Sequence, residues 1–200
     1  AKQTPILDDV ICSTDSDEIG RIADMCGVDV IKRPASLAGD ESHLIEALEH
    51  ALGQYHSIKG YWPDITVSLY GNVPYRKTSI KDGVDFLYKN RADSVFTACK
   101  VRKYNPDWMF RAGGSGRIVF EHNSLQYRCQ DLPKIYIATD AFIVSKTRAL
   151  LNRRPRTSLY SDFGERIYFF EEGMNDTVDI DDLNDLKYFD FLLACDDENG

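Results

Sequence analysis

The chain has 200 residues, 43% of them hydrophobic and 28% charged, and its formal net charge is −8. That length suits one sizeable α/β domain with enough apolar side chains to bury a core, so the composition excludes a disordered chain. The acidic balance argues against binding to nucleic acid or to an anionic membrane, because phosphate polymers select basic surfaces.

Strand-like apolar runs alternate with amphipathic helical stretches over the first half of the chain. Acidic residues at 15–18 favour the start of a helix, because they lie at its positive end. In chain order we expect a strand at 10–13, a helix to about 26, a strand at 28–32, a helix at about 41–57, a strand at 65–70, a helix at 79–89 and a strand at 94–101. This alternation is typical of an α/β fold, a three-layer α/β/α arrangement around a parallel sheet.

The regularity breaks between about residues 103 and 133. Turn signals at Asn105-Pro106, Gly113–Gly116 and Asn123 surround a strand-like run at 118–121, which predicts a hairpin or lobe that leaves the main sheet. The segment carries large apolar side chains outside the expected core: Trp108, Met109, Phe110, Val119, Phe120 and Tyr127. We therefore expect one domain over 1–200 with an inserted protruding lobe at 103–133 that forms a two-fold dimer contact.

After this lobe we expect a strand at 135–145, a helix at 147–152, strands at 166–171 and 177–181, and a helix at 183–193. The strand at 177–181 presents Asp179 and Asp181 from one face, where two like charges repel unless a cation lies between them. Hard oxygen ligands beside a substrate's phosphates suit Mg²⁺, or Mn²⁺ in its place. The alternative is that Asp179 ends the strand and Asp181 or Asp182 caps the next helix.

The chain has five cysteines, an odd number without a C-x-x-C pair, which favours a reducing compartment. No run approaches the roughly 18 apolar residues of a membrane span, and the first five residues do not read as a signal peptide. We expect a cytoplasmic protein.

Five separate segments resemble, in order, the acylneuraminate cytidylyltransferases, also called CMP-sialic acid synthetases. The resemblance spans about residues 6–195, and its motifs are Val10–Asp15 with Glu18-Ile19, Arg33–Asp40, Pro74-Tyr75-Arg76, Arg128–Pro133 with Tyr136, and Val178–Asp181 with Asp185-Leu186. It implies a Rossmann-like nucleotide-diphospho-sugar transferase sheet. It also implies CTP and a nonulosonic sugar acid as substrates, a CMP-sugar and pyrophosphate as products, and a homodimer whose lobe packs on the partner.

The resemblance also assigns roles to residues of the matched motifs. Asp179 and Asp181 would hold the metal, and with Arg76 they would form the catalytic group. Arg76 and Arg128 carry planar guanidinium groups suited to phosphate or carboxylate. The remaining substrate-binding residues are Arg33, Asp40, Glu41 and Ser42 for cytosine and ribose, and Gln130 and Tyr136 near the sugar. The alternative is that Asp40 and Ser42 only cap the helix that follows them.

The segment Tyr70–Pro74 resembles the Gly-Asp-Glu-Pro turn of the related KDO cytidylyltransferases. Asn72 stands where that turn has its metal-binding Asp. An amide oxygen can ligate or accept a hydrogen bond, although it brings no charge. Asn72 is thus a candidate third ligand, and the alternative is a residue that caps a turn.

The chain departs from the family pattern in two places. The family's glycine-rich basic loop would precede the matched region, and Ala1–Pro5 does not contain it, so we expect either a chain that lacks an N-terminal segment or an inactive protein. The family's Asn-Gly-Ala reads Thr139-Asp140-Ala141 here, which bears on the identity of the sugar.

Two other functions remain as alternatives. One is a metal-dependent glycosyltransferase that uses Asp179-Ile180-Asp181 as its D-x-D motif, although only 19 residues follow Asp181. The other is a catalytically inactive module for nucleotide binding or dimerisation. Pyrophosphate release from CTP separates both from the leading prediction.

Overall fold

The computed structural model describes residues 1–39, 41–102, 104–120, 125–152, 155 and 157–197. The chain divides into two compact units, each assembled from three stretches. Unit 1 comprises Ala1–Ser68, Ser79–Val95 and Ile143–Tyr168, and unit 2 comprises Leu69–Thr78, Phe96–Phe142 and Phe169–Gly200.

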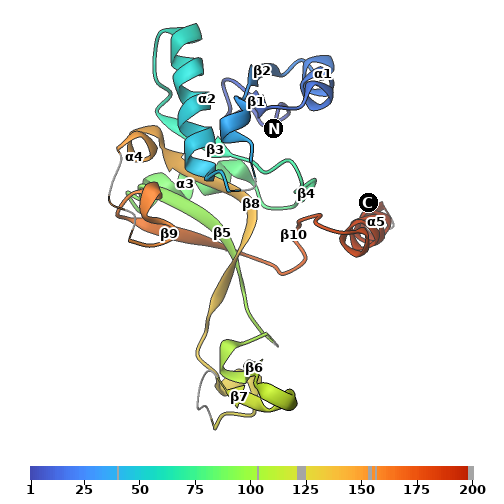
Figure 1. Cartoon of the computed structure of the whole chain (residues 1–200). Coiled ribbons are helices and arrows are strands. Elements are labelled where there is room, and N and C mark those ends of the chain that lie inside the picture. Colours follow the sequence, from blue (N-terminus) through green and yellow to red (C-terminus); the bar gives the residue numbers. More distant parts are fainter. Residues whose placement is uncertain (40, 103, 121–124, 153–154, 156, 198–200) are drawn as a thin grey trace. The chain divides into compact units, whose positions relative to one another are not determined.

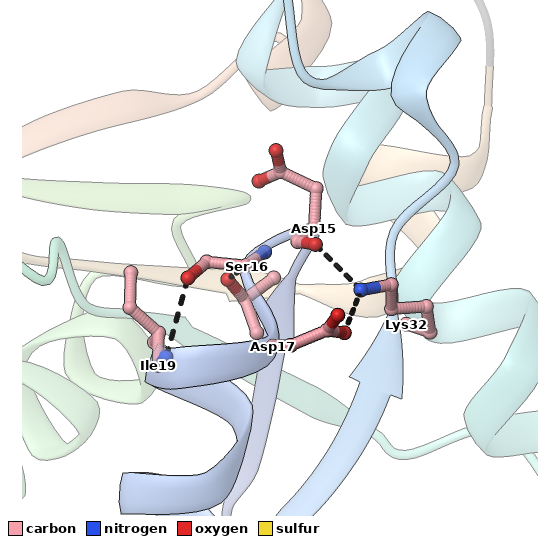
Figure 2. Close-up of polar contacts among 6 residues, drawn as sticks. Asp15, Ser16, Asp17, Ile19 and Lys32 are labelled. Atoms are coloured by element: carbon pink, nitrogen blue, oxygen red, sulfur yellow. Dashed lines mark hydrogen bonds and ion pairs between the residues drawn. The ribbon is translucent and has the colours of Figure 1, made fainter.

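Unit 1 begins with a strand, helix and strand, as predicted. Parallel strands β1 (Ile11–Thr14) and β2 (Asp29–Lys32) flank helix α1 (Asp17–Met25), and Ile11 lies opposite Asp29. Ser16 caps α1 by accepting a 3.3 Å hydrogen bond from the Ile19 main-chain N–H (Figure 2). The remaining helices of this unit are α2 (Leu44–Lys59), α3 (Ile80–Lys89) and α4 (Thr147–Leu151). Each matches a predicted helix within three residues at either end.

A four-stranded sheet has the order β3-β8-β5-β9, made by Ile65–Ser68, Tyr136–Lys146, Ser94–Lys100 and Ile167–Glu172. Six of the seven residues of β5 are buried, which makes this strand a centre of the core. The expectation of a parallel sheet is wrong for β3 and β8, which pair in antiparallel fashion with Ile65 opposite Lys146. The connection from β3 to β8 contains strands of its own as well as helix α3, and it is not a single crossover helix, so nothing in it requires parallel pairing.

Unit 2 contains two further strand pairs and the last helix. Strands β6 (Phe110–Ala112) and β7 (Ile118–Phe120) form the antiparallel hairpin predicted for the lobe, with Phe110 opposite Phe120. Figure 1 shows this hairpin at the end of two segments that run on from β5 and into β8. Short 3-10 turns complete both units, at Ala35–Leu37, Pro106–Trp108, Gly114–Gly116, Cys129–Asp131 and Ser161–Phe163.

The second strand pair of unit 2 positions Asp179 and Asp181. Strand β4 (Tyr75–Arg76) pairs antiparallel with β10 (Thr177–Val178), and helix α5 (Leu183–Asp197) follows. A small core forms where Tyr75, Val178 and Leu192 pack together with Ile180 and Phe189. Strand β10 therefore ends at Val178, earlier than the predicted strand at 177–181, and Asp179–Asp182 connects it to α5.

A tight contact in unit 1 fixes the chain before β9. The Asp93 carboxylate accepts hydrogen bonds from the main-chain N–H groups of Glu165, at 3.2 Å, and Arg166, at 3.0 Å. It also pairs with the Arg166 guanidinium at 3.2 Å. Gly164 has a φ of 105°, and a Cβ added there would lie 2.5 Å from the Asp93 Cβ. Glycine is required at this point for both its backbone conformation and its lack of a side chain.

Candidate functional site

The amide of Asn72 bridges Asp179 and Asp181 in unit 2. Its Nδ2 donates to Asp179 Oδ1 at 2.5 Å and to Asp181 Oδ1 at 3.3 Å. The main chain repeats the contact, because the Ile180 N–H donates to the Asn72 carbonyl at 2.8 Å. The two carboxylates predicted to share a cation thus share a hydrogen-bond donor, and the turn that carries Asn72 is held against them.

The electrostatics at Asp179 favour a positive charge. Burial raises the pKa of its carboxyl, and the charges of Asp181, Asp140 and Asp185 raise it further. The hydrogen bond from Asn72 acts in the opposite direction and does not cancel these effects. A carboxylate that is harder to ionise for these reasons is stabilised by a nearby cation.

The donor set fits a hard cation that also binds a substrate's phosphates. Mg²⁺ is commonly held by one or two carboxylates plus phosphate oxygens and water, which Asp179 and Asp181 match. Within the part of the chain that the structure describes, no group of three or more His, Cys, Asp or Glu side chains is placed to hold a metal ion. Asn72 turns its nitrogen toward the carboxylates, so its oxygen does not face them as a ligand would.

The capping alternative applies to Asp182 alone. Asp182 Oδ1 accepts from the N–H groups of Asn184, at 2.6 Å, and Asp185, at 3.1 Å, in the first turn of α5. Asp185 in turn accepts from the N–H groups of Asp181 and Asp182 at 3.0 and 2.9 Å. This is a reciprocal capping box, and its N–H donors lower the pKa of the Asp182 carboxyl. Asp182 caps the helix and leaves the carboxylate of Asp181 for another role.

Arg76 contacts the main chain at two places. Its Nε donates to the Ala141 carbonyl and its Nη2 to the Tyr70 carbonyl, both at 2.6 Å. Burial lowers the pKa of this guanidinium. The catalytic role predicted for Arg76 assumed that these nitrogens face a phosphate or a carboxylate, and the structure gives them to two carbonyls instead.

Asp140 is a residue that sequence reasoning did not place in the site. It interrupts β8 with a φ of 57°, a conformation that non-glycine residues seldom adopt. Burial raises the pKa of its carboxyl, and its charge acts on Asp179. The available signal was the departure from Asn-Gly-Ala, where the family has the glycine that such a φ favours.

The other candidates of unit 2 lie in the lobe and in β8. Arg128 is exposed and pairs with Asp131 at 3.4 Å, and the Gln130 amide, with its oxygen toward the guanidinium, accepts from Arg128 at 2.5 and 2.7 Å. Tyr136 donates to Glu171 at 3.2 Å, and burial together with this contact raises the pKa of the Tyr136 hydroxyl. Arg128 and Gln130 therefore form one polar group.

The candidates for reading the nucleotide lie in unit 1, after the carboxyl ends of the parallel strands. Arg33 follows β2 and is anchored to β1, because its Nη2 donates to the Ser13 carbonyl at 2.5 Å and its Nε to the Ser13 hydroxyl at 3.3 Å. Ser42 closes a turn with Gly39, whose N–H it accepts at 3.1 Å. Glu41 is exposed next to it, and Asp40 lies outside the described residues.

The proposal that Ser42 caps the following helix is wrong. Helix α2 begins at Leu44, and His43 occupies the capping position without a side-chain hydrogen bond. The hydroxyl of Ser42 instead holds the preceding turn in place. Ser42, a predicted substrate-binding residue, thus closes the turn that begins at Gly39.

Lys32 contacts the segment Asp15–Asp17 at the start of α1. Its ammonium donates to the Asp15 carbonyl at 2.6 Å and to the Asp17 carboxylate, and the Asp15 carboxylate points away from it (Figure 2). These contacts connect the ends of β1 and β2. The crevice outside the carboxyl ends of adjacent parallel strands is where α/β folds commonly bind ligands.

Comparisons with known proteins confirm the resemblance. No family model matches the chain. Post-translational flagellin modification protein B of Campylobacter coli is 27% identical over 195 residues, which cover 96% of this chain and 80% of that protein. N-acylneuraminate cytidylyltransferase of Streptococcus agalactiae serotype V is 24% identical over 192 residues, and this chain spans 44% of its length.

A solved structure supports the same fold. CMP:2-keto-3-deoxy-manno-octonic acid synthetase in complex with CTP matches with a TM-score of 0.68 and 13% identity, over 98% of this chain and 84% of that one. The predicted α/β fold is therefore confirmed. Among the described residues, no helix has both the length and the apolar character needed to cross a membrane.

Proposed function

We propose that this chain is a cytidylyltransferase that activates a nonulosonic, sialic-acid-like sugar acid with CTP and gives a CMP-sugar and pyrophosphate. The observation that carries the proposal is the carboxylate pair of Asp179 and Asp181, to both of which the Asn72 amide donates a hydrogen bond. The relative named for N-acylneuraminate supports the substrate class. We further propose one nucleotidyltransferase domain over 1–200 with the lobe at 103–133, located in the cytoplasm.

In this reaction the anomeric hydroxyl of the sugar attacks the α-phosphate of CTP. Asp179 and Asp181 would hold Mg²⁺, or Mn²⁺, which supplies neutralising charge to the phosphate oxygens when bound. The Asn72 amide steadies the two carboxylates by donating to both. Asp182 and Asp185 fix the start of α5, so the main chain on one side of Asp181 has a defined geometry.

Substrate recognition would divide between two groups of residues. Arg33, with Asp40, Glu41 and Ser42, would read cytosine and ribose, which the anchoring of Arg33 on β1 supports. The exposed guanidinium of Arg128 and the amide of Gln130 would bind the carboxylate and hydroxyls of the sugar acid, with Tyr136 nearby in sequence.

The test of the proposed function is pyrophosphate release. The protein is incubated with CTP, Mg²⁺ and a panel of sugar acids, and pyrophosphate is measured for each. Release that depends on a nonulosonic acid supports the proposal. Nucleotide binding without pyrophosphate release, whichever sugar acid is added, would favour the catalytically inactive module. Transfer of a sugar from a nucleotide-sugar to an acceptor would indicate the glycosyltransferase.

We expect CTP to stabilise the fold more than ATP, GTP or UTP does. A ligand that binds only the folded state raises the melting temperature, and the segment from Arg33 to Ser42 would discriminate the base. Thermal melting with each nucleotide at equal concentration measures the effect. Equal shifts with all four nucleotides would contradict base reading.

We expect a homodimer that forms through the β6–β7 hairpin. The side chains of Phe110 and Phe120 are 54% and 61% exposed, and they meet edge to face with ring centroids 6.2 Å apart. Replacing both by Ser should give a monomer in light scattering at micromolar concentration, because the apolar contact area is lost. Ile58→Ser is the control, since Ile58 is 71% exposed on α2 and should leave the mass unchanged. A parent chain that is monomeric at this concentration would contradict the predicted homodimer.

A further inference from the structure

Arg76 joins two segments of the main chain that are distant in sequence. One is the turn at residues 70–73, whose Tyr70 carbonyl accepts from Nη2, and the other is Ala141 in β8, whose carbonyl accepts from Nε. Both bonds measure 2.6 Å. A guanidinium is planar and presents its N–H groups at fixed angles, so it sets the spacing between the two carbonyls.

Thr97 holds the same point of β8, because its hydroxyl accepts hydrogen bonds from main-chain N–H groups of that strand. Its hydroxyl oxygen accepts from the main-chain N–H of Ala141 at 3.1 Å and from that of Phe142 at 3.5 Å. Thr97 is 1% exposed and Ala141 is 0% exposed, so these groups have no access to water. Ala141 is thus fixed by a side chain at its N–H and by another at its carbonyl.

This double attachment lies beside a strained residue. Asp140 has a φ of 57°, which costs of order 1 kcal/mol for a residue with a side chain and persists only where the surroundings determine it. Its charge acts on the carboxyl of Asp179. The bonds of Thr97 and Arg76 fix Ala141, the residue that follows Asp140 in β8.

The contacts continue from the turn to the carboxylate pair. Two residues after Tyr70, the Asn72 carbonyl accepts from Ile180 at 2.8 Å, and the Asn72 amide donates to Asp179 and Asp181. A path of hydrogen bonds therefore leads from Thr97 through Ala141 and Arg76 to the turn and from there to the two carboxylates.

We propose that Arg76 and Thr97 are positioning residues of the transfer reaction, which fix the Asn72 turn and the Asp140–Ala141 segment relative to the carboxylates of Asp179 and Asp181. The inference rests on the proposed function, and it replaces the direct catalytic role predicted for Arg76. Residues that orient metal ligands from behind typically contribute 10- to 100-fold to metal affinity or activity.

The experiment compares four variants of the full chain with the parent. Thr97→Val keeps the shape of the side chain and removes the acceptor of two buried N–H groups, whereas Thr97→Ser keeps the hydroxyl. Arg76→Lys keeps the charge and loses the geometry that serves two carbonyls. Arg148→Lys is the matched control, because Arg148 is exposed on α4.

Two quantities are measured for each variant: binding of Mn²⁺ without substrate, from the electron paramagnetic resonance signal of free Mn²⁺, and kcat and KM for CTP. We expect Thr97→Val and Arg76→Lys to weaken Mn²⁺ binding about 10-fold or more and to lower kcat by a similar factor. The KM for CTP should stay within about twofold. Thr97→Ser and Arg148→Lys should behave as the parent does.

The outcome separates this inference from the proposed function. Altered Mn²⁺ binding in Thr97→Val and Arg76→Lys, without pyrophosphate release by the parent from any sugar acid, would reject the proposed reaction and keep the positioning role at the carboxylate pair. Parental Mn²⁺ affinity and kcat per folded molecule in both variants would overturn the positioning role. A parent chain that does not bind Mn²⁺ would overturn it as well, since Asp179 and Asp181 would then have no cation to place. If Thr97→Val does not fold, the comparison of Arg76→Lys with the parent and with the Arg148→Lys control decides alone.

Discussion

Replacing Asp179 or Asp181 by Asn should lower metal-dependent pyrophosphate release about 100-fold or more. The loss follows because each carboxylate would supply negative charge to the cation that neutralises the phosphates, and an amide supplies none. Folding should remain nearly intact, since burial and the neighbouring charges of Asp181, Asp140 and Asp185 already disfavour the ionised form of Asp179. Thermal melting and pyrophosphate release are measured on the same preparations.

Asp182 provides the matched control for this pair. It is adjacent in sequence but caps α5 through two N–H donors. Asp182→Ala should lower the free energy of unfolding by about 1 kcal/mol and preserve turnover per folded molecule. The variants of Asp179 and Asp181 should thus change turnover, whereas the variant of Asp182 should change the free energy of unfolding. Unchanged turnover in Asp181→Asn would remove the metal pair from the proposed mechanism.

Gly164→Ala should lower the free energy of unfolding by about 2 kcal/mol or more. The added methyl group would lie 2.5 Å from the Asp93 Cβ, and the φ of 105° is unfavourable for any residue with a side chain. Relief of the clash would displace Asp93, whose carboxylate accepts from Glu165 and Arg166. Urea denaturation followed by circular dichroism measures the change.

Gly53→Ala is the control, because it makes the same chemical change inside a helix. Gly53 lies in α2, and a Cβ added there meets nothing within 4 Å. Alanine is favoured over glycine in a helix by about 0.5–1 kcal/mol, so this variant should be more stable than the parent. Destabilisation of both variants to the same extent would show that the contact with Asp93 is not what requires Gly164.

The elements of the fold were largely predictable, because their signals are local. The run of apolar residues in β5 and the spacing of the apolar side chains in α2 depend only on nearby residues. The antiparallel direction of β3 and β8 could not be predicted in this way. Pairing direction depends on residues 65–68 and 143–146 meeting across a long connection, and alternating composition does not encode it.

The site shows the same division between local and long-range information. The spacing of Asp179 and Asp181 was visible in the sequence, and so was a candidate cap for α5. The partners of Arg76 were not, because a guanidinium suits a phosphate and a pair of main-chain carbonyls equally well. Asp140 has a φ of 57° within β8 and its charge acts on Asp179, and no periodicity of the sequence reports either feature.

Strand β4 is only two residues long, yet it secures both ends of the segment that carries the carboxylates. Tyr75 and Arg76 pair with β10 before Asp179, and at the other end of α5 Asp196 accepts from the Tyr75 hydroxyl at 2.5 Å and pairs with Lys77 at 2.7 Å. A segment tethered on both sides has few conformations left to lose when it takes up a ligand. The conformational entropy of ordering Asp179 and Asp181 would then be lost during folding, and the affinity of the site for a cation would reflect this preorganisation.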